Sequence, residues 1–569
     1  MQNMDRQFLT LVKHFFGRFF DKESRPSDSD SYTGLIQLLT LIVLPGFVMS
    51  FFMMTSPGPA SRTLRRLWGQ VGDHYSYVCY GMVVMGMVMT FKWDSLFPDR
   101  RDYMILSSLP ITVRRLFAAK VVALAAFLSL FVIAINICSM FIVPITYPNP
   151  QGSLGWLFDA FLAHGIAVIG ASLFTALFFA ALQGVLINVM TPAGFRRISP
   201  RIQMVSISIL VMVFLTLPLF KQGIRPLTEN YSDGLSYMPF IWFLGLYESF
   251  LPGDTRHPMF HVWAFSAIKA FAAITIICVA SYAVGYRRYS KKLLESLDSD
   301  AIPTRWWQAV FANALNRTLL RDTYQRATFY FIGKIANRSN KHRIMTALYM
   351  GAGIALAISF AFVFNPRAAS GFPFRLSPLG SLEAPVMLAF LFITGLRASF
   401  NIPYELGANW IFRTTGNGET GGYLKAVRKW VFVCRIIPLY IILAPLEFTF
   451  FPPDIAIAHI LFDLALAAVV IELFFVSFNK VPFTCSYPTD KFRLAGLAVG
   501  YLYGFITYVG IMGLLKRWAA ADPRHLAQFL VVAAAILAAF ALNRRRKRKR
   551  IPLVYQDEPN TFVRTLDLS

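Results

Sequence analysis

The chain has 569 residues, of which 56% are hydrophobic and only 15% are charged, and its formal net charge is +25. Soluble domains usually carry about 25% charged residues, so this composition excludes an ordinary soluble protein and places most of the chain in lipid. Lys and Arg are spread between apolar stretches rather than gathered on one surface, which argues against nucleic acid as a partner.

Long apolar stretches predict an all-α polytopic membrane protein with about twelve transmembrane helices, because about 20 apolar residues cross a bilayer. A shorter apolar stretch, Leu235–Leu251, is bounded by Pro residues and is predicted to be a re-entrant or interfacial segment. The predicted spans cover approximately 34–54, 75–92, 117–145, 157–190, 203–221, 260–286, 344–364, 384–400, 430–450, 455–478, 494–515 and 525–543.

The basic residues orient these spans. With the N-terminus inside, the inner segments hold about 42 Lys and Arg and the outer loops about 11, as the positive-inside rule requires. The opposite orientation would place the basic run Arg544–Arg550 outside. Both termini are therefore predicted to be cytoplasmic, and the first 33 residues do not have the pattern of a cleavable signal peptide.

Two segments outside the spans have apolar residues on one helical face and basic residues on the other. In Asp5–Phe20, a row of Phe, Leu and Val faces Arg6, Lys13 and Arg18. The segment Ala327–Arg343 has the same character. Such helices are typical of the membrane surface, and a helix packed on protein is the alternative for each.

The order of one surface helix followed by six spans occurs twice, which predicts two six-helix transmembrane halves. The predicted divisions are 1–300, 301–550 and a short cytoplasmic tail, 551–569. The halves share only this order of hydropathy, because the loops after their second spans differ in sequence. Duplications of this kind are common in transporters.

The inner loop after the second span, Phe91–Lys120, mixes acidic, basic and aromatic residues over a short distance. Aromatic side chains ringed by charge are how protein interfaces concentrate binding energy. The loop is therefore predicted to dock a partner, through Trp93, Asp94, Phe97, Asp99, Arg100, Arg101, Asp102 and Tyr103.

The corresponding loop of the second half is Ser399–Trp430, in which Asn409, Trp410 and Arg413 are the docking candidates. Its Gly-rich run does not fit a phosphate-binding loop, because Lys425 follows Tyr423 and Leu424 rather than a Gly. We expect a flexible turn between two docking helices there. The basic residues beside it are interpreted mainly as cytoplasmic anchors: Lys425, Arg428 and Lys429.

In Phe97–Lys120 a charged stretch is followed by Leu109-Pro110-Ile111, a basic pair and a Lys at the next span. This order resembles the cytoplasmic coupling loop of bacterial ABC-2 type exporter permeases, especially a branch of large twelve-span permeases. Three other stretches resemble the same branch: Arg326–Arg343, Ile402–Arg413 and Pro482–Tyr487. The resemblance implies a bacterial inner-membrane protein whose loops sit in grooves of a separate ATP-binding subunit.

Ionisable side chains inside predicted spans are costly in lipid and usually face protein or water. Their depths pair Arg435 with Glu472 and place Asp463 close to mid-span. Structural pairing between helices is the preferred interpretation, and a substrate or proton path is the alternative. The intramembrane candidates are Lys269, Arg435, Glu447, Asp463 and Glu472.

Neither a metal nor a cofactor is expected. The five cysteines are scattered, and most lie in or beside apolar spans. His257 and His261 are four residues apart on one helical face, but no further ligand stands at a useful spacing.

These observations predict the transmembrane permease subunit of an ABC exporter, powered by a separate ATPase subunit in two copies, and not an enzyme in its own right. One chain is expected to supply both halves of the pore. The alternative is a twelve-span secondary transporter driven by an ion gradient, with Asp463, Glu447 or Lys269 as the coupling group. A membrane-embedded enzyme with dispersed catalytic groups is a third hypothesis. The sequence does not identify the transported substrate.

Overall fold

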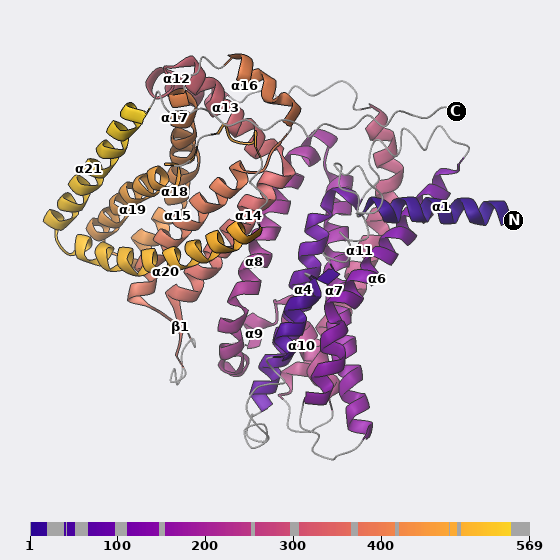
Figure 1. Ribbon diagram of the computed structural model, residues 1–569. Coiled ribbons are helices and arrows are strands. Elements are labelled where there is room, and N and C mark those ends of the chain that lie inside the picture. The colour runs from indigo at the N-terminus through magenta and orange to yellow at the C-terminus, as the bar shows by residue number, and fades with distance from the viewer. Residues whose placement is uncertain are drawn as a thin grey trace, which may run out of the picture. The chain divides into compact units, whose positions relative to one another are not determined.

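The computed structural model divides the chain into two compact units, and each is described by itself. The first unit is Met1–Asp300 with Phe364–Arg375, and the second is Ala301–Val363 with Leu376–Ser569. Helices dominate the described part of both units (Figure 1). The structure describes all residues except 1, 20–38, 41, 52–66, 97–110, 147–153, 231, 252–256, 296–305, 366–373, 405, 416–419, 477, 479, 486–490 and 548–569.

Nine helices in the described part of the chain are long and apolar enough to cross a membrane, which confirms a polytopic all-α membrane protein. Each coincides with one of the predicted spans. They are Arg114–Thr146, Leu154–Val189, Ala193–Asn230, Met259–Val284, Asn340–Ala361, Pro378–Phe400, Gly422–Phe450, Pro453–Phe474 and Pro523–Arg544.

The other three predicted spans are helical where they are described, but they do not belong to these nine. The first is seen as a short helix, Ile42–Phe51, and the eleventh lies in α20, Lys491–Ala521. The second is α4, Leu67–Phe91, which carries Tyr, His and Gly among its apolar residues. Because α4 is buried along nearly its whole length, it has little need of the apolar surface that a lipid-facing helix requires.

The first unit is built around α4, which contacts α6, α7, α8 and α10. Helix α10 is too short to cross a bilayer and is largely buried against α7 and α11, so the apolar stretch predicted as re-entrant packs into the bundle. The helices of the unit are α1 (Gln2–Arg18), α4, α6 (Val113–Thr146), α7 (Leu154–Val189), α8 (Pro192–Asn230), α9 (Ser232–Leu235), α10 (Pro239–Phe250) and α11 (Met259–Glu295), with the 3₁₀ turn η1 (Trp93–Ser95) after α4.

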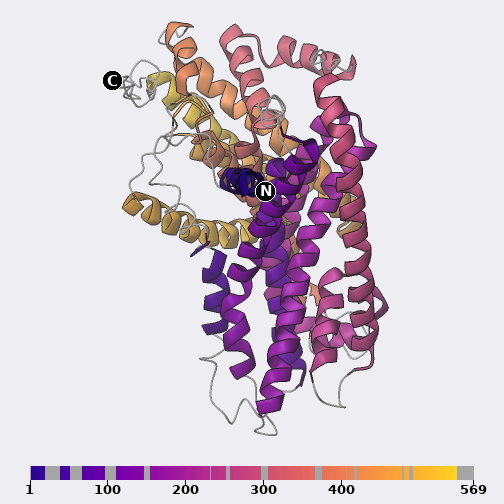
Figure 2. The same cartoon turned by 90° about the vertical axis from the view of Figure 1, so that its right-hand side faces the viewer.

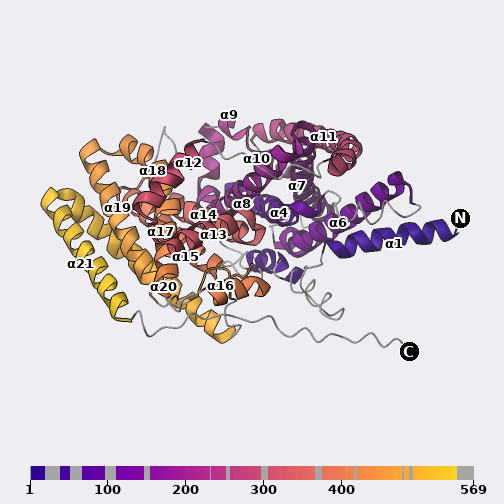
Figure 3. The ribbon, with the colours of Figure 1, turned by 90° about the horizontal axis from the view of Figure 1, so that it is seen from above.

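Helix α1 is the first predicted amphipathic helix, and its apolar face packs on α6. Phe15 and the next residue after the helix, Phe19, are buried. Phe19 stacks on Phe127 at 4.7 Å between ring centroids, and the Lys120 ammonium lies over the rings of Phe15 and Phe19. The helix runs crosswise to the long helices of its unit, so that it is seen end-on beside the N label in Figure 2. It lies next to α6 in Figure 3. The exposed Leu9 leaves part of its apolar surface uncovered.

In the second unit α14 packs closely against α15. The glycine at position 395 of α15 allows this approach, since a Cβ there would lie 2.5 Å from Cβ of Tyr349 on α14. Two short paired strands, β1 and β2, connect α14 to α15, and Phe364–Arg375 within this connection belongs to the first unit. The elements are α12 (Trp306–Thr318), α13 (Thr323–Arg338), α14 (Asn340–Ala361), β1 (Phe362–Phe364), β2 (Phe374–Leu376), α15 (Pro378–Phe400), η3 (Leu406–Asn409), α16 (Trp410–Thr415), α17 (Thr420–Val431), η4 (Phe432–Ile436), α18 (Ile437–Phe450), α19 (Pro453–Phe474), α20 (Lys491–Ala521) and α21 (Pro523–Lys547).

The second predicted amphipathic helix, Ala327–Arg343, is wrong in its C-terminal limit. Helix α13 ends at Arg338, Ser339 is extended, and the next helix begins at Asn340. The buried face of α13 packs on α17, with Gly333 close to the Trp430 indole. A helix packed on protein, which was the alternative to a membrane-surface helix, therefore describes the buried face of α13.

Candidate functional site

A buried cluster of ionisable side chains connects α18, α19 and α20 in the second unit. His459 and Asp463 are four residues apart, so they share one face of α19. Glu447 lies near the end of α18, which a short turn connects to α19. Lys516 comes from α20. The local helix geometry and one turn therefore bring three of the four groups together, whereas Lys516 arrives only by tertiary packing.

The cluster alternates acidic and basic groups, whose nearest atoms lie 2.8 to 3.8 Å apart. The Lys516 ammonium donates to Oδ2 of Asp463 at 2.8 Å and lies 3.8 Å from Oε1 of Glu447. Nδ1 of His459 lies 3.0 Å from Oε2 of Glu447. All four side chains are buried, and Lys516 is 0% exposed. Charges withdrawn from water in this way persist only when they are paired.

The sequence prediction named two of these four residues. Asp463 and Glu447 were expected as intramembrane candidates, and the structure brings them to the same ammonium. His459 and Lys516 were missed. The i,i+4 spacing of His459 and Asp463 was a readable signal for the first, but no local signal identifies Lys516 as the partner.

The predicted pairing of Arg435 with Glu472 is wrong. Glu472 instead contacts Arg428, at 3.1 Å from its Nε, and Arg544 of α21. The Arg435 guanidinium lies over the Trp430 ring, 4.8 Å from its centroid. The predicted depths did not fix the direction in which each side chain leaves its helix, and this direction decides which groups pair.

Lys269 of α11 is not part of a buried cluster in the described residues. Its side chain is exposed, and its ammonium lies 4.5 Å from the centroid of the Phe265 ring on the same helix. A flexible stem allows such a lysine to carry its charge toward a membrane surface.

The first unit contains a second buried cluster, which the sequence prediction missed. Nδ1 of His74 lies 2.5 Å from Oε1 of Glu248, and the imidazole stacks on Tyr247 at 3.9 Å. The Tyr247 hydroxyl lies 2.9 Å from Nδ1 of His164. Beside them, Asp73 pairs with Lys221 of α8. His74 comes from α4, Tyr247 and Glu248 come from α10, and His164 comes from α7, so the cluster holds the short α10 in the bundle.

Trp93 was predicted as an aromatic anchor for a partner, and the structure corrects this. The indole is 0% exposed and donates from Nε1 to the Ser199 hydroxyl at 2.7 Å, while Gln183 donates to the Trp93 carbonyl at 2.8 Å. Trp93 therefore joins the ends of α4, α7 and α8 inside the first unit. Asp94 follows in η1, and its side chain lies outside the described residues. The remaining docking candidates of this loop also lie outside them: Phe97, Asp99, Arg100, Arg101, Asp102 and Tyr103.

In the second predicted docking loop, Asn409 is buried and donates to the Thr484 carbonyl at 2.8 Å. Its amide therefore holds the loop against the turn before α20 rather than facing outward. Trp410 and Arg413 lie on α16, and their side chains are not described. Ile411, between them, is 45% exposed.

Helix α17 continues into the membrane span without a break. The π-turn η4 joins α17 to α18 (Figure 1). The segment Gly422–Phe450 is thus a single helix that is long and apolar enough to cross a membrane. Lys429 donates to the Leu319 carbonyl at 2.6 Å, and Arg428 donates to the Phe475 carbonyl at 2.9 Å. The continuous helix Thr420–Phe450, made of α17, η4 and α18, is called the rod below. It connects the predicted docking loop to the end of α19 and to the end of α12.

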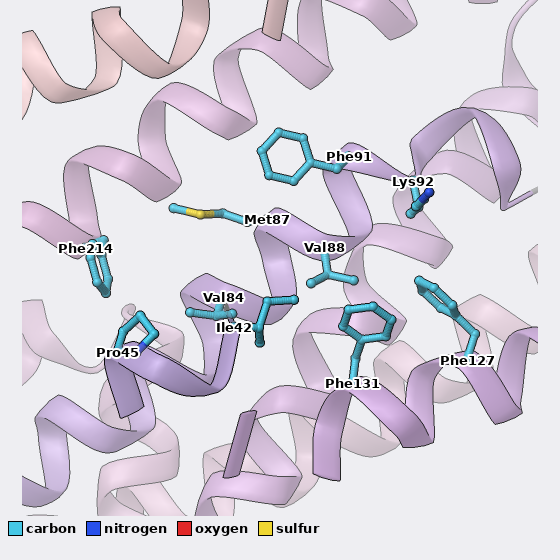
Figure 4. Close-up of a pocket in the computed structure, with 10 residues that line it drawn as sticks. All are labelled: Ile42, Pro45, Val84, Met87, Val88, Phe91, Lys92, Phe127, Phe131 and Phe214. Carbon is cyan, nitrogen blue, oxygen red and sulfur yellow. The ribbon is translucent and has the colours of Figure 1, made fainter. Parts of the chain in front are cut away.

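An apolar pocket of about 320 Å³ lies in the first unit between the short helix Ile42–Phe51, α4, α6 and α8. A volume of this size is within the range of small-molecule sites. Figure 4 shows side chains of these elements ringing the hollow, with Lys92 at one end. The lining residues are Ile42, Pro45, Val84, Met87, Val88, Phe91, Lys92, Phe127, Phe131 and Phe214.

Within the residues that the structure describes, no group of three His, Cys, Asp or Glu side chains is arranged to hold a metal ion. No protein-family model matches the chain, and neither the curated proteins nor the solved structures include a match. The functional proposals below therefore rest on the residues and the fold of this chain.

Proposed function

We propose that the chain is the transmembrane permease subunit of an ABC exporter in a bacterial inner membrane, coupled through its cytoplasmic loops to a separate ATPase present in two copies. The observation that carries the proposal is the continuous rod from the second predicted docking loop through α17 and η4 into α18. A permease of this class must convert movement of an ATPase at the membrane surface into movement of its spans.

The contacts of the rod support such a role. Trp430 packs between α13 and the Arg435 guanidinium, and Arg428 contacts both the Phe475 carbonyl and Glu472. A displacement of α17 is therefore passed to α18 through the backbone and to α19 through the Arg428 side chain. Single-turn π segments inside helices occur frequently at functional sites, and η4 lies where this rod enters the span.

The test is association with an ATPase. The full chain is co-expressed with an ATP-binding subunit that carries a Walker A sequence, and the complex is purified and assayed for ATP hydrolysis. Charge reversal at Asp99 or Asp102 is expected to lower co-purification at least fivefold, since these carboxylates are predicted to pair with basic residues of the partner. The matched control is Asp454→Lys, which reverses an exposed carboxylate at the far end of α19.

A second set of variants tests the rod itself. Replacing Phe432 and Val433 by Gly softens the π-turn while leaving the docking loop unchanged. The complex is then expected to form normally but to lose the change in ATP hydrolysis that the permease imposes on the ATPase. Unaltered co-purification of the Asp99 and Asp102 variants, or coupling that survives the double Gly variant, contradicts the proposal. Two copies of this chain per ATPase pair would contradict a pore made from one chain.

One observation favours a different function, a secondary transporter driven by an ion gradient. The buried cluster of Glu447, His459, Asp463 and Lys516 has groups that exchange protons, and such clusters line proton paths in transporters. Vesicles that contain the purified chain, an ion gradient and no nucleotide separate the two functions. Net solute movement under these conditions supports the secondary transporter and rules out the permease proposal.

A further inference from the structure

The apolar pocket of the first unit lies beside a strongly basic end of the bundle. Val84, Val88 and Lys92 follow one another at intervals of one helical turn, so the pocket extends about 12 Å along α4 toward its C-terminal end. That end is joined to α8 by the Trp93–Ser199 hydrogen bond. The basic residues of the same end are Lys92, Arg114, Arg115, Arg196, Arg197 and Arg201.

The opposite end of the unit carries the carboxylates whose side chains are described. They lie at the start of α4 and α7, at the end of α8, and in α9 and α10. Asp73 at the start of α4 pairs with Lys221 late in α8, which fixes the antiparallel direction of these two helices. Among the side chains that the structure describes, the pocket therefore has an apolar body along the spans and basic residues gathered at one end. The carboxylates are Asp73, Asp159, Glu229, Asp233 and Glu248.

Apolar side chains at and near the pocket are exposed on the surface of the unit, where a bilayer would place lipid. Phe91 is 42% exposed at its rim, and Phe47 and Phe51 of the short helix are 46% and 47% exposed. The inner wall is closely packed, since Phe127 is 0% exposed, stacks on Phe19 and lies 4.6 Å from the Phe131 ring between centroids. A hollow of this size beside lipid loses dispersion contacts unless a flexible apolar chain fills it.

We infer that this pocket binds one acyl chain of an anionic membrane lipid, with the lipid headgroup at Lys92 and the surrounding arginines. The apolar lining takes the chain and excludes polar ligands. The basic end selects a negatively charged headgroup, as clusters of Lys and Arg at a membrane surface do. The inference does not depend on the permease proposal, because lipid occupancy is measured without transport.

The test uses the full chain reconstituted in vesicles with a photoactivatable phosphatidylglycerol whose reactive group is near the tail end. A phosphatidylcholine with the same tail serves as the neutral comparison. After irradiation, labelled positions are mapped by peptide mass spectrometry. Phosphatidylglycerol is expected to label the α4 and α6 walls, 84–92 and 127–131, about five times more than phosphatidylcholine. Both lipids are expected to label exposed positions on α11, such as Ile276 and Val279, equally.

Two variants with matched controls separate the tail from the headgroup. Val88→Trp fills the pocket and is expected to abolish labelling of its walls, whereas Ile133→Trp on the exposed face of α6 leaves it unchanged. Lys92→Gln is expected to remove most of the fivefold preference for the anionic lipid, and Lys269→Gln, at an exposed position of α11 outside the basic end, to retain it.

Absence of label from the pocket walls of the native chain overturns the inference, as does full labelling of Val88→Trp. Equal labelling by both lipids overturns the headgroup assignment. If Val88→Trp does not fold, the comparison of the two lipids in the native chain and in Lys92→Gln decides the matter alone.

Discussion

In the part of the chain that the structure describes, each unit buries a pair of a carboxylate and a histidine, but the surroundings of the two pairs differ. In the first unit His74 lies against Glu248, and Lys221, which pairs with the adjacent Asp73, is 37% exposed. In the second unit His459 lies against Glu447, and Lys516 is 0% exposed between Glu447 and Asp463. The second unit thus holds a lysine side chain away from water, whereas the His74 imidazole of the first stacks on Tyr247.

This difference indicates which cluster carries more of the stability of its unit. Removing one partner of a buried ion pair leaves an uncompensated charge, and this costs more than the loss of a hydrogen bond between groups that can be neutral. We therefore expect the second cluster to be the more sensitive of the two, and the following predictions rank the expected losses.

The largest effect is expected for Lys516→Met. The variant leaves Asp463 and Glu447 without their ammonium and should lower the free energy of unfolding by about 3–5 kcal/mol. Equilibrium unfolding in mixed detergent micelles measures this. The control is Arg517→Met, which removes an exposed cation one residue further along α20. Adding Asp463→Asn to Lys516→Met should recover part of the loss, and a double variant as unstable as the single one would contradict a charge-based cause.

A smaller effect is expected for His74→Phe in the first unit. The ring keeps its stacking on Tyr247 but no longer bonds to Glu248, so the loss should be about 1–3 kcal/mol in the same assay. His261→Phe, at an exposed position of α11, is the matched control. A loss larger than that of Lys516→Met would reverse the proposed ranking of the two clusters.

The smallest effect is expected for Trp93→Phe. The change keeps an aromatic ring in the core but removes the hydrogen bond to Ser199, which should cost about 0.5–1.5 kcal/mol. Trp306→Phe, where the side chain is 79% exposed, should have no measurable effect. If Trp93→Phe left stability unchanged but weakened association with an ATPase, the docking role predicted from the sequence would be restored.

Much of the membrane architecture could be predicted from the sequence, because apolar length is a local property of the chain. Nine of the predicted spans coincide with helices long and apolar enough to cross a membrane. The apolar face of the N-terminal helix was also readable, since it depends only on helical spacing. The C-terminal limit of the second amphipathic helix could not be predicted. The helix ends at Arg338, but the alternation of apolar and basic residues continues past that position in the sequence.

The candidate sites were only partly predictable. The cost of burying a charge identifies Asp463 and Glu447 as residues that need partners, and it does so from the sequence alone. It does not identify the partner, because Lys516 lies 53 residues from Asp463 along the chain. Trp93 shows the opposite error, in which a residue predicted to contact a partner is buried in its own unit. Its charged surroundings in the sequence resemble an interface, but the side chain lies inside the bundle.

The sequence by itself determined that this chain is a membrane protein. Insertion into a bilayer depends on the hydrophobicity and charge of continuous stretches of about 20 residues, which can be read directly from the chain. Only the tertiary structure decided that α4 is the buried centre of the first unit, that Glu472 pairs with Arg428 and Arg544, and that an apolar pocket opens beside Lys92. These features depend on which faces of distant helices meet, and side-chain direction across a helix interface is set by packing rather than by order along the chain.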